Sequence, residues 1–428
     1  MDQRKLALYQ QYVRILEEEL IPAMGCTEPI AIAYGAAYIR DLLGKIPEEV
    51  HITVSGNLVK NAKSVTVPNT NGLRGIEASV AAGIVAGKAE KLLEVIADVT
   101  ENDIKNIREY LEKDVIEVEL GESPLAFDYT ITAKSGQDTA LIRLANAHTN
   151  IVRSEKNGEI LINVPVEDEK CTGLCDHSCL SIENIVKFAE EIDVGLVAPL
   201  LERQIEYNSA IAEEGLTGDW GACIGRTIMA CCGDDVMNRA KARAAAGSDA
   251  RMNGCSLPVV ILSGSGNQGI TASVPVITYA EKLGASGEKL LRALLIADLT
   301  AIHLKTDIGR LSAFCGVVCA GAGAGAGICY LEGGGFKEIA HTVVNTLAVS
   351  SGIICDGAKA SCAGKIALAV EAGILGWYMY KTGNQFYGGD GIITKGVEKT
   401  IKNVGRLGHH GMKTTDREIL EIMLQIDN

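Results

Sequence analysis

Aromatic side chains are scarce in this 428-residue chain: Phe, Trp and Tyr make up 4% of it, whereas glycine alone occurs 47 times. With so few rings, the core must be packed from aliphatic and small side chains. A chain of this length can still bury a large core, and we expect it to form two or three domains.

Positive charge is also in deficit. The formal net charge is −14 and the sequence pI is near 5.1, which makes nucleic acid and anionic membrane surfaces poor partners. The first 20 residues have the pattern of an amphipathic, acidic helix without the apolar core of a signal peptide. We therefore expect a cytoplasmic protein that binds neither nucleic acid nor membrane.

Cysteine, by contrast, is abundant. The chain has thirteen, an odd number that argues against a disulfide framework in a large intracellular protein. Several of them must be small buried hydrophobes. The alternative for the others is that a subset binds a metal.

A long uncharged run covers residues 311–331 and follows the polar residues His303, Lys305, Asp307 and Arg310. Its length meets the requirement for a membrane span, but most of its residues are Gly and Ala, which gain little from lipid. We expect instead a buried small-residue helix, against which neighbouring helices or a compact cofactor can pack. The polar residues at its start then belong to a candidate site.

The pattern predicts an α+β fold: a large, mostly helical catalytic domain (1–95 and 169–428) with an inserted small α+β domain (96–168). Most of the insert alternates and is rich in β-branched residues, with its longest strand running through His148. Residues 50–67 are predicted to form one or two further strands, and the remaining segments have helical patterns.

Two loops offer polar groups to a small ligand. Asn69 and Thr70 precede an Ala- and Gly-rich helix, where they suit either ordinary N-capping or the binding of a carboxylate or phosphate. The loop 262–270 presents Ser265 and Asn267 on a glycine-rich backbone. It lacks the βαβ context of a dinucleotide fingerprint and the Gly-Lys-Ser/Thr of a P-loop, so we do not expect NAD there.

One cysteine-rich segment has the pattern C-x3-C-x3-C, with Cys171, Cys175 and Cys179 beside His177. This resembles a metal knuckle, but zinc and ferredoxin sites use C-x2-C spacings. Metal binding by this segment stays open.

Cys26, Cys315 and Cys355 are widely separated along the chain. Pro29 suits the first turn of a helix, so Cys26 lies just before a helix N-terminus, which favours a thiolate. Ligands so scattered do not fit a zinc finger, but they fit a cofactor held by several elements of a helical domain, with an iron–sulfur cluster as the leading case. Three thiolates on a four-iron cluster would leave one iron open as a Lewis acid.

Seven segments carry a family resemblance when taken together and in order. They are MGCTEP (24–29), VPNTNGLRGIEAS (67–79), HTNI (148–151), GSDARMNGC (247–255), SGSGNQGITA (263–272), IGRLSAFCG (308–316) and ICDGAKASC (354–362). With them the chain resembles the L-cysteine desulfidase family, relatives of the catalytic chain of iron–sulfur L-serine dehydratase.

This resemblance implies an oxygen-sensitive [4Fe–4S] cluster held by Cys26, Cys315 and Cys355. It also implies β-elimination from a small amino acid, which for L-cysteine yields hydrogen sulfide, pyruvate and ammonia. Cys362 competes with Cys26 as the third ligand, because serine dehydratases use a comparable late pair of cysteines.

In such a site Lys305 is the first candidate for the base that removes the α-proton, and His303 is the second. Arg310 is expected to grip the α-carboxylate in bidentate fashion. The other substrate-binding candidates are polar loop residues that would hold the carboxylate and amine: Ser265, Asn267, Asn69 and Thr70.

Two other functions stay open. The first is an iron–sulfur L-serine dehydratase, because serine and cysteine differ in one atom. The second is a non-catalytic metal-binding or membrane protein, which the long uncharged run favours and the polar loops between helices oppose. A homodimer is the candidate assembly.

Overall fold

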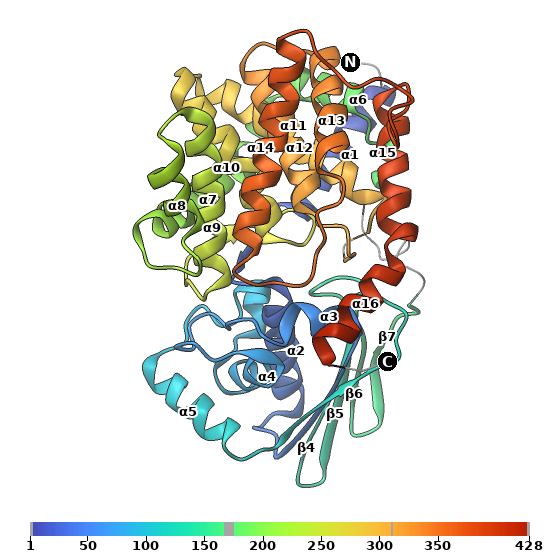
Figure 1. Cartoon of the computed structure of the whole chain (residues 1–428). Coiled ribbons are helices and arrows are strands. Elements are labelled where there is room, and N and C mark those ends of the chain that lie inside the picture. The colour runs from blue at the N-terminus through green and yellow to red at the C-terminus, as the bar shows by residue number, and fades with distance from the viewer. Residues whose placement is uncertain (1–2, 167–174, 310, 426–428) are drawn as a thin grey trace.

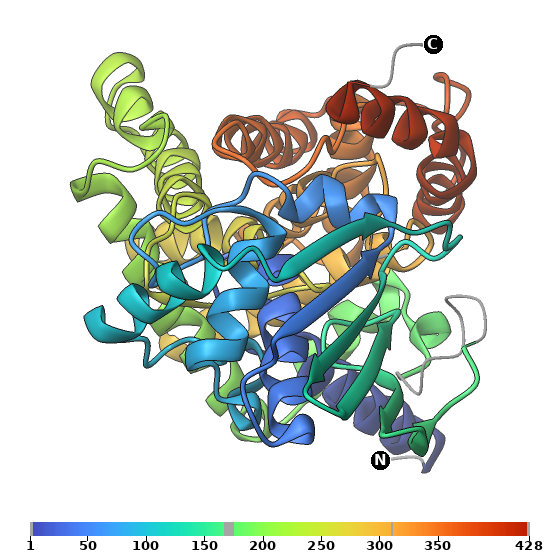
Figure 2. The same ribbon diagram turned by 90° about the horizontal axis from the view of Figure 1, so that it is seen from below.

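The computed structural model describes residues 3–166, 175–309 and 311–425. Two parts are stacked on one another (Figure 1): a mostly helical part above, and a sheet with its own helices below. Seen from below in Figure 2, the sheet and the helices beside it lie across the end of the helical part. The predicted α+β fold with a large helical portion is confirmed.

The helical part is built from segments at both ends of the sequence. It comprises α1 (Gln3–Glu19), α6 (Ile182–Glu191), α7 (Ala198–Thr217), α8 (Ile224–Cys232), α9 (Val236–Met252), α10 (Gly266–Leu283), α11 (Gly287–Thr306), α12 (Val317–Leu331), α13 (Phe336–Ser350), α14 (Cys362–Lys381), α15 (Val397–Arg406) and α16 (Lys413–Leu424).

Helix α12 is the centre of this part. Every residue in it except Tyr330 is buried, and α10, α11, α13 and α14 pack around it. A Cβ at Gly323 would come within 2.3 Å of the Ala297 carbonyl oxygen on α11, and one at Gly325 within 2.5 Å of the Gly373 oxygen on α14. The prediction of a buried small-residue helix is confirmed, and the glycines are what let three helix backbones touch.

Within the described residues, one helix is long and apolar enough to cross a membrane by length and composition. It is α14, and 56% of its apolar window is buried. Because α14 packs against α9, α12 and α13, it occupies the position of a core helix, which passes the same test.

The lower part contains a six-stranded sheet in the order β3-β2-β4-β5-β6-β7, in which only β2 and β3 are parallel. Its strands are β2 (Glu49–Val54), β3 (Ile116–Leu120), β4 (Asp128–Ser135), β5 (Asp138–Ala145), β6 (Ile151–Lys156) and β7 (Glu159–Asn163). The sheet thus joins strands from both sides of residue 96, and the domain division proposed there stays a prediction.

Helix α2 (Thr27–Leu43) covers one face of the sheet and contacts β4 and β5. Tyr129 on β4 donates to the Ala31 carbonyl at 2.6 Å, and Gly35 leaves room for that ring, since a Cβ there would lie 2.5 Å from its hydroxyl. The other helices of the lower part are α3 (Gly56–Ala62), α4 (Gly75–Ala86), a 3₁₀ segment (Ala89–Glu94) and α5 (Glu101–Leu111).

Several contacts between described residues join the parts, and two of them involve secondary structure. Strands β1 (Pro22–Met24) and β8 (Pro258–Val260) form an antiparallel pair, and α16 descends to pack on α3 (Figure 1).

Two local predictions were wrong. Residues 56–62 form α3 rather than a second strand, because Ser55 begins a helix after β2. His148 lies in the turn between β5 and β6, where its ring packs edge-on against Phe127 at 4.9 Å.

The packing around α12 predicts a specific sensitivity. Gly325→Ala should lower the free energy of unfolding by about 1–3 kcal/mol, because the new methyl group must push two helix backbones apart. Gly287→Ala, in a helix position where a Cβ meets nothing within 4 Å, is the control and should be neutral. Urea unfolding of both variants measures this, and equal stability of the two would contradict the packing argument.

Candidate active site

A short antiparallel pairing of backbones brings Cys315 and Cys355 together. Cys315 donates its N–H to the Ile353 oxygen at 3.1 Å, and Cys355 donates its N–H to the Ala313 oxygen at 2.7 Å. These two bonds flank an isolated antiparallel bridge between Phe314 and Ile354. Cys315 lies just before α12, and Cys355 lies in the loop between α13 and α14. The helical hairpin α12–α13 therefore closes the 40-residue gap in sequence.

The two side chains also hydrogen-bond to each other. This bond lowers the pKa of Cys355 and raises that of Cys315 well above its ordinary value; burial acts against the first shift and adds to the second. The nearby cations Lys60 and Lys305 lower the pKa of Cys355 further. The pair thus favours a thiolate at Cys355, which is the form of cysteine that binds a metal.

Cys26 is the residue immediately before α2, as predicted. Gly25, at φ +55°, packs so closely on Pro68 that a Cβ there would lie 2.7 Å from the ring, and Thr27 donates its hydroxyl to the Gly264 oxygen at 3.0 Å. Three of the segments that carry the family resemblance therefore meet at Cys26.

The electrostatic expectation for Cys26 was wrong. Burial raises the pKa of the Cys26 thiol well above its ordinary value, and Glu28 raises it further, whereas Arg251 opposes both. The Cys26 thiol donates a hydrogen bond to the Glu28 carboxylate, with 3.2 Å between Sγ and the carboxylate oxygen. The helix N-terminus does not outweigh the desolvation of a side chain that is only 3% exposed.

Cys362, the first residue of α14, lies in the same place. It packs with Cys26, Val65 and Met252 in one small cluster, and its charge influences the pKa values of Cys315 and of Arg251. Four thiols from three of the resembling segments thus lie near one another. The choice of Cys26 over Cys362 as third ligand stays a prediction.

The donor chemistry of this cluster fits an iron–sulfur group. Within the ranges described above, no three His, Cys, Asp or Glu side chains converge on the position of a single ion. A four-iron cluster places its cysteines on different irons, so they need not share one point. Four sulfur donors beside buried cations suit such an anionic cluster.

The cations were only partly predicted. Lys305, near the end of α11, is 4% exposed and contributes to the lowered pKa of Cys355. Burial raises the pKa of Cys319, and Lys305 opposes that shift. Sequence reasoning missed Lys60 on α3, which is 3% exposed, donates to the Cys355 carbonyl at 3.3 Å and pairs with Asp416 of α16. Its position in an apolar stretch of residues 58–62 was the available signal.

His303 faces a different neighbour. Its Nε2 lies 2.7 Å from a carboxylate oxygen of Glu398 on α15, and that hydrogen bond lowers the pKa of Glu398 against the effect of burial. Of the two candidates, Lys305 is the one that influences the thiol pair, and the choice of base stays a prediction. Arg310 lies outside the described residues.

The polar loop residues divide into two groups. Asn69 donates to the Ile96 carbonyl at 3.0 Å, which ties the loop to the chain after the 3₁₀ segment. Thr70 donates to the Val67 carbonyl at 2.7 Å within its own loop. Ser265 and Asn267 stand at the start of α10, where Asn267 accepts from Arg251 at 3.1 Å. Asn267 is linked to the thiol cluster through Arg251, which sequence reasoning did not single out.

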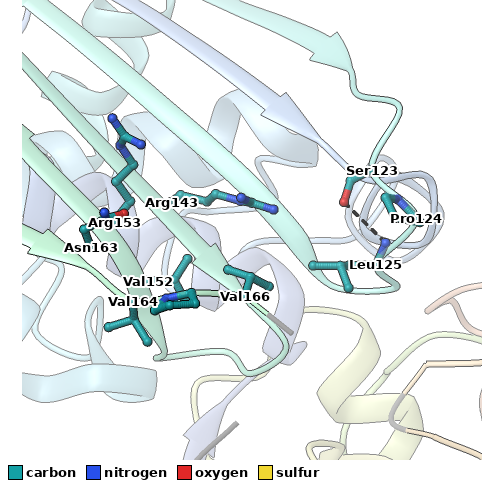
Figure 3. A pocket seen from close by; sticks show the side chains of 10 residues that line it. Ser123, Pro124, Leu125, Arg143, Val152, Arg153, Asn163, Val164 and Val166 are labelled. Atoms are coloured by element: carbon teal, nitrogen blue, oxygen red, sulfur yellow. Dashed lines mark hydrogen bonds between the residues drawn. The ribbon is translucent and has the colours of Figure 1, made fainter. Parts of the chain in front are cut away.

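A separate pocket of about 350 Å³ lies at the edge of the sheet (Figure 3). Arg143 and Arg153 project along it, but each is paired, with Asp128 and Glu155 respectively. None of the four thiols lines it.

The remaining cysteine-rich segment is partly described. Cys171 lies outside the described residues, the Cys175 amide donates to Glu18 at 2.8 Å, and the Cys179 thiol lies 3.5 Å from the Asp176 carbonyl. Metal binding there stays open.

Comparison with known families first gives the class. The family model described as "Serine dehydratase alpha chain" matches residues 90–421, and that description indicates a lyase. The chain belongs to this serine dehydratase alpha-chain family.

Full-length relatives agree with this placement. A UPF0597 protein of Desulfitobacterium hafniense is 57% identical over 99% of this chain and 98% of its own length. UPF0597 proteins of Treponema denticola and Lachnoclostridium phytofermentans are each 48% identical over 97% of this chain, and over 98% and 100% of their own lengths. Their names state no activity.

The thiol cluster predicts which cysteines retain iron. After anaerobic reconstitution, alanine at Cys26, Cys315 or Cys355 should lose the visible absorbance and most of the bound iron, whereas Cys362→Ala should keep both. Cys329→Ala, at the far end of α12, is the buried-thiol control. A full cluster in Cys26→Ala together with its loss in Cys362→Ala would reverse the assignment of the third ligand.

Proposed function

We propose that this protein is an iron–sulfur lyase that eliminates hydrogen sulfide from L-cysteine and leaves pyruvate and ammonia. The observation that supports this most is the convergence of Cys26, Cys315, Cys355 and Cys362 beside buried cations. Family membership supports the reaction class, and the seven resembling segments support cysteine as substrate.

In this proposal Cys26, Cys315 and Cys355 hold a [4Fe–4S] cluster. When bound, such a cluster supplies one iron without a protein ligand, which acts as a Lewis acid toward a leaving sulfur.

The chain's own part is to hold the amino acid and move a proton. Lys305 takes the proton from Cα, the resulting electron pair forms the Cα–Cβ double bond, and the Cβ–S bond breaks with its electrons going to sulfur. The product, 2-aminoacrylate, tautomerises to an imine that water hydrolyses to pyruvate and ammonia. Burial of Lys305 excludes water from the proton transfer.

L-Serine is the second candidate substrate, because the matching family model carries the description of a serine dehydratase. Serine would bind through the same carboxylate and amine, with water in place of hydrogen sulfide as the leaving molecule.

The substrate prediction is tested by product release. Reconstituted protein should release sulfide and pyruvate from L-cysteine in equal amounts, with a higher kcat/KM than for pyruvate formation from L-serine. The Cys315→Ala variant treated in the same way is the control for adventitious iron sulfide. A much higher kcat/KM for serine would replace the substrate while leaving the reaction class intact.

The assignment of the base is tested by hydrogen exchange. Lys305→Met keeps the apolar volume of the buried side chain and should retain the cluster's absorbance. It should slow exchange of the substrate α-hydrogen with deuterated solvent at least about 100-fold, the usual scale of general-base catalysis.

His303→Gln is the matched variant on the same helix. It should leave exchange within a few-fold of wild type, because His303 faces Glu398. Exchange that survives in Lys305→Met and disappears in His303→Gln would assign the base to His303.

A further inference from the structure

Arg251 is a buried cation that no carboxylate pairs with in the part of the chain that the structure describes. It lies in the last turn of α9 and is 2% exposed. Its Nη1 donates to Asn267, whereas its Nε and Nη2 have no partner among the described residues. An unpaired buried guanidinium is costly, so this arrangement calls for an explanation.

The two unpaired nitrogens belong to the same edge of the guanidinium. The N–H bonds of Nε and Nη2 point in parallel, which is the geometry that binds both oxygens of a carboxylate. Across the described ranges, no carboxylate forms an ion pair with Arg251. Glu28 is the carboxylate that influences the pKa of Arg251, and a Glu28 oxygen accepts from the Cys26 thiol instead.

The same guanidinium faces the start of α10. A Cβ at Gly266 would come within 2.3 Å of Nε and 2.7 Å of Cζ, so the missing side chain there makes room for Arg251. Ser265 provides no side-chain cap. No acceptor is found within the described residues for the backbone N–H groups of residues 266–268.

Two positive features therefore point at one place, the unpaired guanidinium edge and the N-terminal end of an 18-residue helix. Placing them together is unfavourable unless an anion lies between them. The site is also next to the thiol cluster, because Arg251 is close enough to Cys26 and Cys362 to influence the pKa values of both.

We propose that Arg251 and the first amides of α10 form the subsite that binds the α-carboxylate of the amino-acid substrate. Only Cα and Cβ then separate this carboxylate from the leaving atom, so the subsite selects a short amino acid whose leaving group can reach the cluster. This inference deepens the proposed function and rests on it for the identity of the substrate.

Binding of L-alanine tests the subsite without turnover, because alanine carries the carboxylate and amine but no leaving group. L-Alaninamide, which lacks the negative charge, is the paired probe. Calorimetric titration of the reconstituted full-length chain should show alanine binding and much weaker alaninamide binding. Arg251→Met should weaken alanine binding at least about 30-fold, the loss for a buried charge pair of about 2 kcal/mol, and should leave alaninamide binding unchanged.

A stability measurement separates this role from a structural one. Arg251→Met should have a Tm equal to or above that of wild type, because it removes an unpaired buried charge. Arg243→Met is the matched control on α9. Arg243 is 6% exposed but is paired with Glu213 and Glu281, so its replacement should lower Tm and keep the affinity for alanine.

Equal alanine binding by wild type and Arg251→Met would overturn the inference, as would tight binding of alaninamide by wild type. Loss of iron from Arg251→Met with unchanged discrimination between the two probes would assign Arg251 to the cluster instead. If Arg251→Met does not fold, Arg251→Lys decides, because a point charge cannot replace the fork: weaker alanine binding supports the subsite, and equal binding overturns it.

The two proposals can fail separately. Arg251-dependent binding of alanine without sulfide release from cysteine would remove the proposed reaction and keep the carboxylate subsite. Sulfide release from cysteine together with unchanged alanine binding in Arg251→Met would do the reverse.

Discussion

The site depends on the antiparallel bridge between Phe314 and Ile354, because this contact sets Cys315 against Cys355. Between these residues the chain runs out along α12 and back along α13, and the two ends meet again only if both helices keep their positions. Those positions follow from the glycines of α12, which allow the backbones of α11 and α14 to approach. The geometry of the thiol pair therefore depends on the small-residue packing of the core.

The sequence predicted local features such as helix starts, but it did not predict which distant segments or charges pair with one another. The buried α12 followed from its composition, and the helix start after Cys26 followed from Pro29. The sequence did not predict that β2 pairs with β3 and β4, which begin some 65 or more residues later. An alternating pattern predicts a strand but not the strand with which it pairs. Arg251 was missed for a similar reason. It lies in the same Ala-rich helix as Lys241 and Arg243. Only the three-dimensional contacts show that those two cations are paired with carboxylates and that Arg251 is not, among the described residues.

Buried charge is distributed unevenly around the thiols. Lys60 has Asp416 as a partner, whereas the guanidinium edge of Arg251 has none among the described residues. Each buried cation favours thiolates and anionic ligands nearby, and each costs stability when no anion is present. An unpaired buried cation lowers folding stability but strengthens the binding of anions. Ligands with negative charge should therefore raise the stability of the chain when they bind at this site.

Three of the four thiols come from the later part of the chain, and one comes from the earlier part. Cys315, Cys355 and Cys362, together with Arg251, lie inside the range that the serine dehydratase alpha-chain model matches, whereas Cys26 and Lys60 precede it. The earlier segment reaches the site through the β1–β8 pair and the hydrogen bond from Thr27 to Gly264. If Cys26 is a ligand, the cofactor joins the two parts of the chain, and its loss should loosen their contact. If Cys362 takes that place, the helical part holds the cofactor alone, and residues 1–89 serve mainly to close the site and keep Cys355 beside a buried lysine.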